Sequence, residues 1–320
     1  MTQIPASLIL SIPLMLNVWP FSKELCPPPE TLEPCRCQGN KSYAAVLCED
    51  VFSEDDLTSV MTAIKDKPID GVELRSVSMR YIPEDAFDGT NLKSIEIVNS
   101  SIMSLSENEH AFKGLEDTLL ILRVINCSYA SVWDWTLLER LNKLKELEIS
   151  NSNLIELEDE FLKLARLPMK IINFRDNNLK ELPYKAFSAF TSLKQLHLGK
   201  NALQSVERSL LPLPAKKLHT LGLSQNKIEE LPVDMFTQMP KLRFLFLEGN
   251  PILIVDAKTF QPVWNQLKII FLNNALHCDC RMSWMTEMKE KLRLLQGACS
   301  SPPRLRGRKI ALLKSEELVC

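Results

Sequence analysis

Apolar residues recur along most of the chain in copies that begin 23 to 27 residues apart. In each copy an apolar residue is followed three and five positions later by two more, and a polar or small residue follows three positions after that. The clearest copy is Leu193, Leu196, Leu198 and Asn201. Eight copies in tandem begin at positions 69, 92, 119, 144, 169, 193, 218 and 242. The apolar–polar–apolar centre of each copy predicts a short strand with its apolar side chains on one face.

This pattern resembles the leucine-rich repeat, whose period lies in the same range. A single repeat cannot bury its own apolar face, so neighbours stack into a continuous core. We therefore expect an α/β solenoid, a horseshoe with a parallel sheet on its concave side. The polar position is expected to turn inward and to bind backbone groups of adjacent coils; it is occupied by Asn177, Asn201, Asn226, Asn250 and Asn274. A ninth copy lies around Ile269, Phe271 and Asn274, with its register open by one residue.

Eight of the nine cysteines form two groups at the ends of the repeat array: Cys26, Cys35, Cys37 and Cys48, and Cys278, Cys280, Cys299 and Cys320. An open solenoid needs terminal covers, and two even sets of cysteines predict disulfide-stapled caps formed in an oxidising compartment. Cys127 stands at the inward polar position of its repeat, which predicts a buried thiol. A zinc site at Cys278 and Cys280 with His277 is the alternative, although structural zinc sites usually separate paired cysteines by two to four residues.

The C-terminal group resembles the cysteine-rich C-terminal flanking domain of extracellular leucine-rich repeat proteins. The matching residues are Asn274 to Cys280, Trp284, Cys299, Pro303, Leu305 to Gly307 and Cys320. That resemblance implies the pairs Cys278–Cys299 and Cys280–Cys320, and the matching N-terminal flanking domain implies Cys26–Cys37 and Cys35–Cys48. The residues alone leave the connectivity open. The basic cluster Arg304, Arg306, Arg308 and Lys309 has two interpretations, a part of this cap motif or a heparin-binding site.

The N-terminal cysteines, a predicted helix at 53–64 and the segment from Ile82 to Gly89 are similar to arthropod secreted proteins named for the non-catalytic subunit of shrimp (Oplophorus) luciferase. In that luciferase the repeat subunit accompanies a small catalytic subunit. The resemblance therefore implies an alternative function, a non-catalytic accessory subunit that stabilises a separate secreted enzyme.

Residues 1–22 carry no charged side chain and hold an apolar run too short to cross a bilayer. They predict a secretory signal peptide cleaved near Ser22, although no Lys or Arg precedes the run and no Ala-x-Ala site follows it. The predicted organisation is a signal peptide at 1–22, an N-terminal cap at 23–68, repeats at 69–273 and a C-terminal cap at 274–320. We expect a secreted, extracellular protein without a membrane span, glycosylated at the acceptor motifs of Asn40, Asn99 and Asn126.

Composition narrows the function. The 320 residues include 38 Lys and Arg against 40 Asp and Glu, a net charge of -2, which argues against a nucleic-acid partner held by overall charge. The sequence contains no phosphate-binding glycine loop, no His-Glu-x-x-His and no Gly-x-Ser-x-Gly motif. The four histidines fall in different repeats or caps. We therefore predict a protein without enzymatic activity, cofactor or metal.

Function is then expected on the concave face, which the residues between the strand leucines form. The predicted protein-binding residues are Arg123, Glu148, Asn173, Arg175, His197, Phe244 and Phe246. The face is acidic in its N-terminal part, whereas Phe244 and Phe246 offer the aromatic side chains that protein interfaces favour. The expected partner is an extracellular protein, in the matrix or as the subunit of a secreted enzyme. Cover of both phenylalanines by a glycan, a cap or a loop is the alternative.

Overall fold

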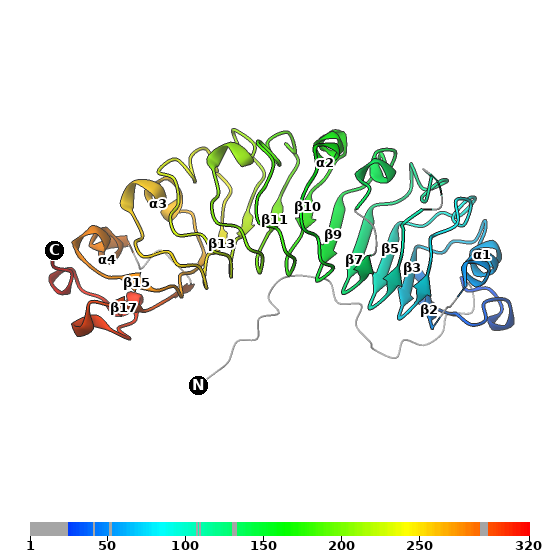
Figure 1. Ribbon diagram of the computed structural model, residues 1–320, viewed down its shortest axis with the longest axis horizontal. Coiled ribbons are helices and arrows are strands. Elements are labelled where there is room, and N and C mark those ends of the chain that lie inside the picture. Colours follow the sequence, from blue (N-terminus) through cyan, green and yellow to red (C-terminus); the bar gives the residue numbers. More distant parts are fainter. Residues whose placement is uncertain are drawn as a thin grey trace.

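The computed structural model describes residues 25–40, 42–50, 53–106, 108, 110–129, 133–288 and 294–320, so the predicted signal peptide lies outside the described residues. The chain forms a curved solenoid in which strands line the concave side and the longer helices and loops lie on the convex side (Figure 1). This confirms the predicted horseshoe. Among the described residues, none of the helices combines the length and the apolar composition that crossing a membrane requires.

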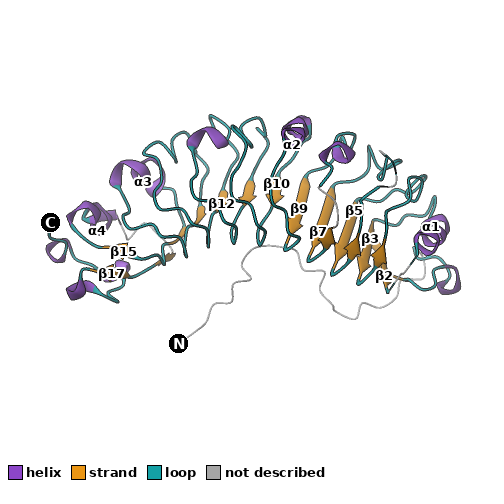
Figure 2. Ribbon diagram, in the orientation of Figure 1, coloured by secondary structure: helices purple, strands orange, loops and turns teal. Residues whose placement is uncertain are grey.

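One twelve-stranded sheet runs from cap to cap (Figure 2). Its strands, in spatial order, are β1 (Arg36–Asn40), β2 (Tyr43–Glu49), β3 (Gly71–Arg75), β5 (Ser94–Val98), β7 (Ile121–Ile125), β9 (Glu146–Ser150), β10 (Ile171–Asn173), β11 (Gln195–His197), β12 (Thr220–Gly222), β13 (Phe244–Phe246), β14 (Ile269–Phe271) and β16 (Leu294–Gln296). β1 and β2 form an antiparallel hairpin, and the later pairs are parallel. Strands of both caps therefore extend the sheet of the repeats.

The remaining elements are short. A three-stranded sheet joins β4 (Ser78–Met79), β6 (Ser101–Ile102) and β8 (Ser128–Tyr129), and a two-stranded sheet joins β15 (Leu276–His277) and β17 (Cys299–Ser301). The α-helices are α1 (Glu54–Ala63), α2 (Asp159–Lys163), α3 (Ala257–Trp264) and α4 (Trp284–Met288). Single 3₁₀ turns occupy Pro29–Thr31, Trp135–Leu138, Leu164–Arg166, Arg208–Leu210, Cys280–Met282, Pro303–Leu305, Ile310–Leu312 and Ser315–Glu317. Helix α1 matches the helix predicted at 53–64 and begins after Ser53, whose hydroxyl accepts the N–H of Asp56.

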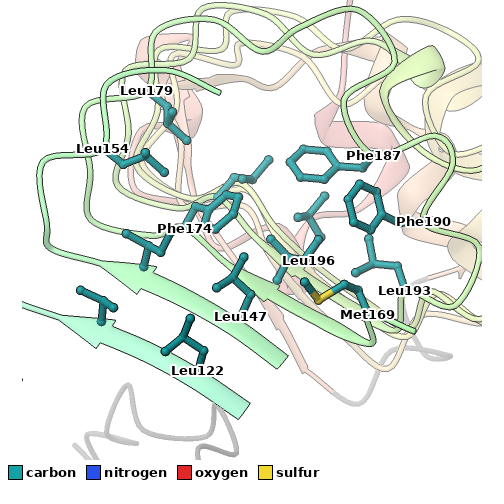
Figure 3. Close-up of a cluster of buried hydrophobic side chains, with 14 of the residues drawn as sticks. Leu122, Leu147, Leu154, Met169, Phe174, Leu179, Phe187, Phe190, Leu193 and Leu196 are labelled. Carbon is teal, nitrogen blue, oxygen red and sulfur yellow. The ribbon is translucent and has the colours of Figure 1, made fainter. Parts of the chain in front are cut away.

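The core is a continuous column of apolar side chains between the concave sheet and the convex loops (Figure 3). The three apolar positions of each repeat point into it, as Leu218, Leu221 and Leu223 do. On the convex side the Phe161 ring lies 5.7 Å from that of Phe187 and 5.3 Å from that of Phe190, measured between centroids. These rings come from successive repeats, so stacking the repeats buries apolar surface that one repeat would leave exposed.

Asparagine amides tie the later repeats together. The Nδ2 of Asn226 donates to the carbonyl of Leu198 at 3.0 Å, and its Oδ1 accepts the N–H of Leu203 at 3.1 Å. Asn177, Asn201 and Asn250 make equivalent bonds to the preceding repeat. In the earlier repeats, smaller side chains replace asparagine at this position. Ser100 and Ser152 accept one backbone N–H each, and the Cys127 thiol donates to the carbonyls of Ile97 and Ile125.

The structure settles the register of the ninth repeat. Ile270 pairs with Leu245, and Ile270 and Leu272 are fully buried. Ile269 and Phe271 therefore point to the concave face, which resolves the register that the sequence left open by one residue. The ambiguity arose because this repeat is one residue shorter than its neighbours before Asn274, and a period-two strand reverses its faces when the register moves by one.

Four disulfides close the caps. They pair Cys26 with Cys37, Cys35 with Cys48, Cys278 with Cys299 and Cys280 with Cys320, as the flanking-domain resemblance implies. Among the described residues, the group that could hold a metal ion is Asp279, Cys280 and Cys320. Both sulfur atoms of that group are in the Cys280–Cys320 disulfide, and the disulfide of Cys278 likewise removes the zinc alternative, because zinc binds thiolates.

Asn226→Ala tests the asparagine ties. The change leaves the buried N–H of Leu203 without its acceptor, so we expect a loss of about 2 kcal/mol in the free energy of unfolding. Urea denaturation measures it. Lys227→Ala, at the exposed neighbouring position, is the control and should stay within about 0.5 kcal/mol of wild type. Equal losses in both variants would contradict the role of the amide.

Cys127 should behave as an inert thiol. It is buried, and burial raises the pKa of its thiol. Iodoacetamide at about pH 8 should leave the native protein unlabelled and should label Cys127 alone after unfolding without reductant. Peptide mapping under these conditions is the measurement. Labelling of the native thiol, or a peptide that links the two caps, would disprove this arrangement.

Candidate protein-binding surface

The seven predicted binding residues lie on the concave face, but they form separate groups. Five of them pair in register along the sheet, with Gly222 of β12 between the last two: Arg123, Glu148, Asn173, His197 and Phe246. Arg123 and Glu148 are the middle residues of β7 and β9, and the other three are the last residues of β10, β11 and β13. Phe244 is the first residue of β13, and Arg175 follows β10 on the same face. The face therefore has a charged N-terminal part, a polar middle and an aromatic C-terminal part.

Arg123 is the centre of the charged part. Its guanidinium lies 2.9 Å from a carboxylate oxygen of Glu96, 2.6 Å from one of Glu146 and 3.7 Å from one of Glu148. These side chains lie along the sheet, and Arg123 is only 13% exposed. We call these four residues the Arg123 cluster. Because three carboxylates surround one guanidinium, the cluster carries a surplus of negative charge.

Burial sets the acidity of this cluster. Loss of solvent raises the pKa of Glu96 and of Glu148, and neighbouring carboxylates add to the effect. Arg123 opposes it for both residues. Glu148 is held further by the hydroxyl of Ser150 and the amide of Asn173, which donate to its Oε1 at 2.8 Å each. Asn173 is thus a positioning group for Glu148 rather than a free binding group.

The middle of the face offers no reactive group. His197 is 94% buried against Gly222, whose missing side chain leaves room for the imidazole ring. Burial, with the positive charge of Arg175, lowers the pKa of His197 to about 4, so the ring is neutral at neutral pH. Its Nε2 lies 3.2 Å from the Oε1 of Gln195. These contacts give His197 a packing role.

The C-terminal part is apolar and faces outward. Phe244 and Phe246 are half-buried while Leu245 between them is fully buried, which agrees with the expected alternation. The rings of Phe246 and Phe271 are 5.3 Å apart between centroids. We call Phe244, Phe246, Ile269 and Phe271 the aromatic patch. Sequence reasoning did not assign its last two members to the concave face, because the register of the ninth repeat was open by one residue.

A buried carboxylate borders the aromatic patch. Glu248 follows Phe246 by two positions on the same face, and burial raises the pKa of its carboxyl group. Its Oε2 has no hydrogen-bond partner within the described part of the chain. This oxygen is shielded from solvent, which agrees with the raised pKa of the carboxyl group.

The three glycosylation acceptors lie at the ends of strands of the concave sheet. Asn40 ends β1 at the hairpin turn, where its Oδ1 accepts the N–H groups of Ser42 and Tyr43. Asn99 and Asn126 follow β5 and β7 and are stacked, with the Nδ2 of Asn126 donating to the Oδ1 of Asn99 at 2.7 Å. Both acceptors lie in turns, and their modification stays a prediction.

The stability of the Glu148→Gln variant relative to wild type should increase as the pH rises. A raised pKa means that folded Glu148 keeps its proton to a higher pH than unfolded Glu148, so wild type loses stability between the two pKa values. Gln cannot ionise. We expect the variant to gain about 1 kcal/mol over wild type between about pH 4 and pH 8. Urea denaturation at both pH values measures this, with exposed Glu316→Gln as the control. A difference that falls with pH would refute the assignment.

Comparisons with known proteins find similarity to leucine-rich repeat proteins. A leucine rich repeat family model matches residues 215–252, and a BspA type leucine rich repeat region model matches residues 62–158. Transforming growth factor beta activator LRRC33 from Danio rerio is 33% identical over 106 residues, which are 33% of this chain and 14% of that protein. The chain therefore matches about one seventh of that relative's length.

Solved structures share the fold at low sequence identity. A chain from the octameric complex of Latrophilin 3, Unc5D and FLRT2, in which FLRT2 supplies the leucine-rich repeats, has a TM-score of 0.65 and 20% identity, over 92% of this chain and 100% of that one. The TLR13–ssRNA13 complex gives 0.57 and 20% identity, over 75% of this chain and 37% of the other. The Drosophila Toll–Spatzle complex gives 0.54 and 17%, over 83% and 46%.

The tandem repeats, the single concave sheet and the cap disulfides agree with these matches. The chain is a leucine-rich repeat protein with disulfide-bonded cysteines at both its N-terminal and C-terminal ends.

Proposed function

We propose that this chain is a secreted, non-enzymatic recognition protein that binds an extracellular protein on its concave face. The observation that carries the proposal is the aromatic patch. Three phenylalanines and an isoleucine are adjacent on β13 and β14 and turn away from the core. Outward aromatic side chains that gather on one face are typical of binding surfaces, because aromatic groups supply large contact areas at little entropic cost.

The rest of the face supplies the polar groups that a protein interface needs around such an anchor. The half-buried side chain of Glu248 lies beside the aromatic patch, and the Arg123 cluster lies further toward the N-terminus on the same sheet. The cluster's surplus negative charge would favour a partner with basic side chains opposite it. In this proposal the aromatic patch provides most of the binding free energy, and the Arg123 cluster determines which partner binds.

The cap disulfides support an oxidising, extracellular setting, since such bonds persist outside the reducing cytosol. The named relatives support protein binding, because their names describe an activator of a growth factor and complexes such as that of Toll with Spatzle. Secretion with a cleaved signal peptide and glycosylation at Asn40, Asn99 and Asn126 belong to the same proposal. The accessory-subunit function stays a hypothesis, and co-purification of a stoichiometric enzyme from the native secretion tests it.

The double variant Phe244→Ser, Phe246→Ser tests the aromatic patch. We expect the affinity for the partner to fall by more than about 1 kcal/mol, since these rings would be buried only in the complex. The experiment compares extracellular proteins retained by immobilised wild type and variant, then measures the affinity of each retained protein. Ile155→Ser, Tyr184→Ser removes two more exposed apolar side chains elsewhere and is the control for the loss of apolar surface.

Stability separates binding from folding. The phenylalanine pair is half-buried, so its loss should cost less than Leu245→Ala, which removes a fully buried side chain and should cost about 2–5 kcal/mol. Equal destabilisation would mean that both rings belong to the core. A partner that binds wild type, the patch variant and the control alike would place the interface on another face.

A further inference from the structure

One edge of the sheet carries a continuous column of basic residues. The residue immediately before each concave strand is Lys145, Lys170, Lys194, His219, Arg243 or Lys268, from β9 to β14. Each backbone N–H in this column donates to the carbonyl of the residue before it in the column, at 2.7–2.9 Å. The six residues are therefore stacked in order along the solenoid. With neighbouring strands about 4.8 Å apart, the column is about 24 Å long.

A second basic column lies two residues further toward the N-terminus of each repeat. Its members are Lys143, Pro168, Ser192, Lys217, Lys241 and Gln266. A buried residue separates the two columns in every repeat, so both columns lie outside the core on the same edge. The Nζ of Lys217 donates to the Oγ of Ser192 at 3.3 Å, which shows that neighbouring members are in contact. Together the twelve positions hold eight Lys or Arg residues and no acidic residue.

We call the eight Lys and Arg residues, together with His219, the basic edge. No carboxylate among the described residues pairs with these eight cations. In an earlier repeat the same position is different, because Lys93 lies 2.6 Å from Asp70 in the preceding repeat. Glu146 is next to Lys145 in sequence, but its carboxylate binds Arg123. Burial, with a further contribution from the positive charge of Lys194, lowers the pKa of His219.

A row of unpaired cations on a rigid edge is complementary to a linear polyanion. The outward positions of both columns carry no large apolar side chain, so a protein segment would find no hydrophobic anchor there. Seven of the eight cations are lysines, which act as point charges and suit separate sulfate groups. The cap disulfides place the chain where sulfated polysaccharides, rather than nucleic acids, are the usual linear polyanions.

We propose that the basic edge binds a sulfated glycosaminoglycan chain that lies along the repeats. A net charge of -2 is compatible with such a site, since the positive charge is concentrated on one edge. The proposal moves the heparin hypothesis away from the C-terminal cap. There Arg308 pairs with Glu317 at 3.3 Å, whereas the eight cations of the basic edge form no ion pair with another described residue. The site adjoins the aromatic patch, because Arg243 and Lys268 directly precede Phe244 and Ile269, but it uses different side chains and does not depend on the proposed protein partner.

The test measures binding of the full mature protein to a heparin oligosaccharide by surface plasmon resonance at about 0.15 M salt. Lys170→Glu, Lys194→Glu should weaken binding about tenfold or more and should flatten its dependence on salt, because fewer counterions are released. The control Lys180→Glu, Lys227→Glu makes the same change in net charge at exposed lysines in the loops after the strands, and should stay within about twofold. Thermal melting checks that both variants fold.

Three outcomes would overturn the proposal. The first is that wild type shows no saturable binding. The second is that the control variant weakens binding as much as the edge variant does. The third is that single-stranded RNA or polyglutamate of equal charge binds more tightly than the oligosaccharide. A second readout does not rely on variants. Bound sulfates would offset the charge of Lys194, so the pKa of His219 followed by NMR should rise when the oligosaccharide is added. An unchanged pKa would place the ligand elsewhere.

Discussion

Each repeat of this protein depends on its neighbours for both its apolar and its polar contacts. The inward leucines of one repeat are covered only when the next repeat stacks on them, and the buried N–H of Leu203 finds its acceptor in the amide of Asn226 one repeat later. Both kinds of contact require the same register. A sheet in constant register then follows, and with it a concave face on which outward residues form straight columns. The Arg123 cluster, the aromatic patch and the basic edge are all sections of these columns.

The fold could be predicted from the sequence because the same pattern of apolar residues occurs in every repeat. Eight copies of an apolar triplet fix the strands, the core and the face that each residue occupies, and the cysteine groups mark the caps. The ninth repeat shows the limit of this reasoning. A single missing residue before Asn274 left two registers open, and only strand pairing distinguished them. That one residue decided whether Phe271 belonged to the core or to the candidate site.

The candidate site was less predictable than the fold, because its properties depend on distances between repeats. The sequence placed Arg123 and Glu148 on one face, but not the carboxylates of Glu96 and Glu146 at a shared guanidinium. His197 and Asn173 were predicted as binding residues, yet one packs over Gly222 and the other holds Glu148. The basic edge was hidden by a net charge near zero, because acidic residues elsewhere balance it.

The two halves of the solenoid are stacked in different ways. Strands β3, β5, β7 and β9 of the concave sheet are five residues long, whereas β10 to β14 are three residues long, and the change occurs where the asparagines begin. Ser152 joins the two halves, since its N–H donates to the Oδ1 of Asn177. Beyond that junction, the interfaces at Asn201, Asn226 and Asn250 use nearly the same bonds. Whole repeats could therefore be duplicated or lost in the C-terminal half during evolution without new interface chemistry, and each such event would lengthen or shorten the concave face by one strand.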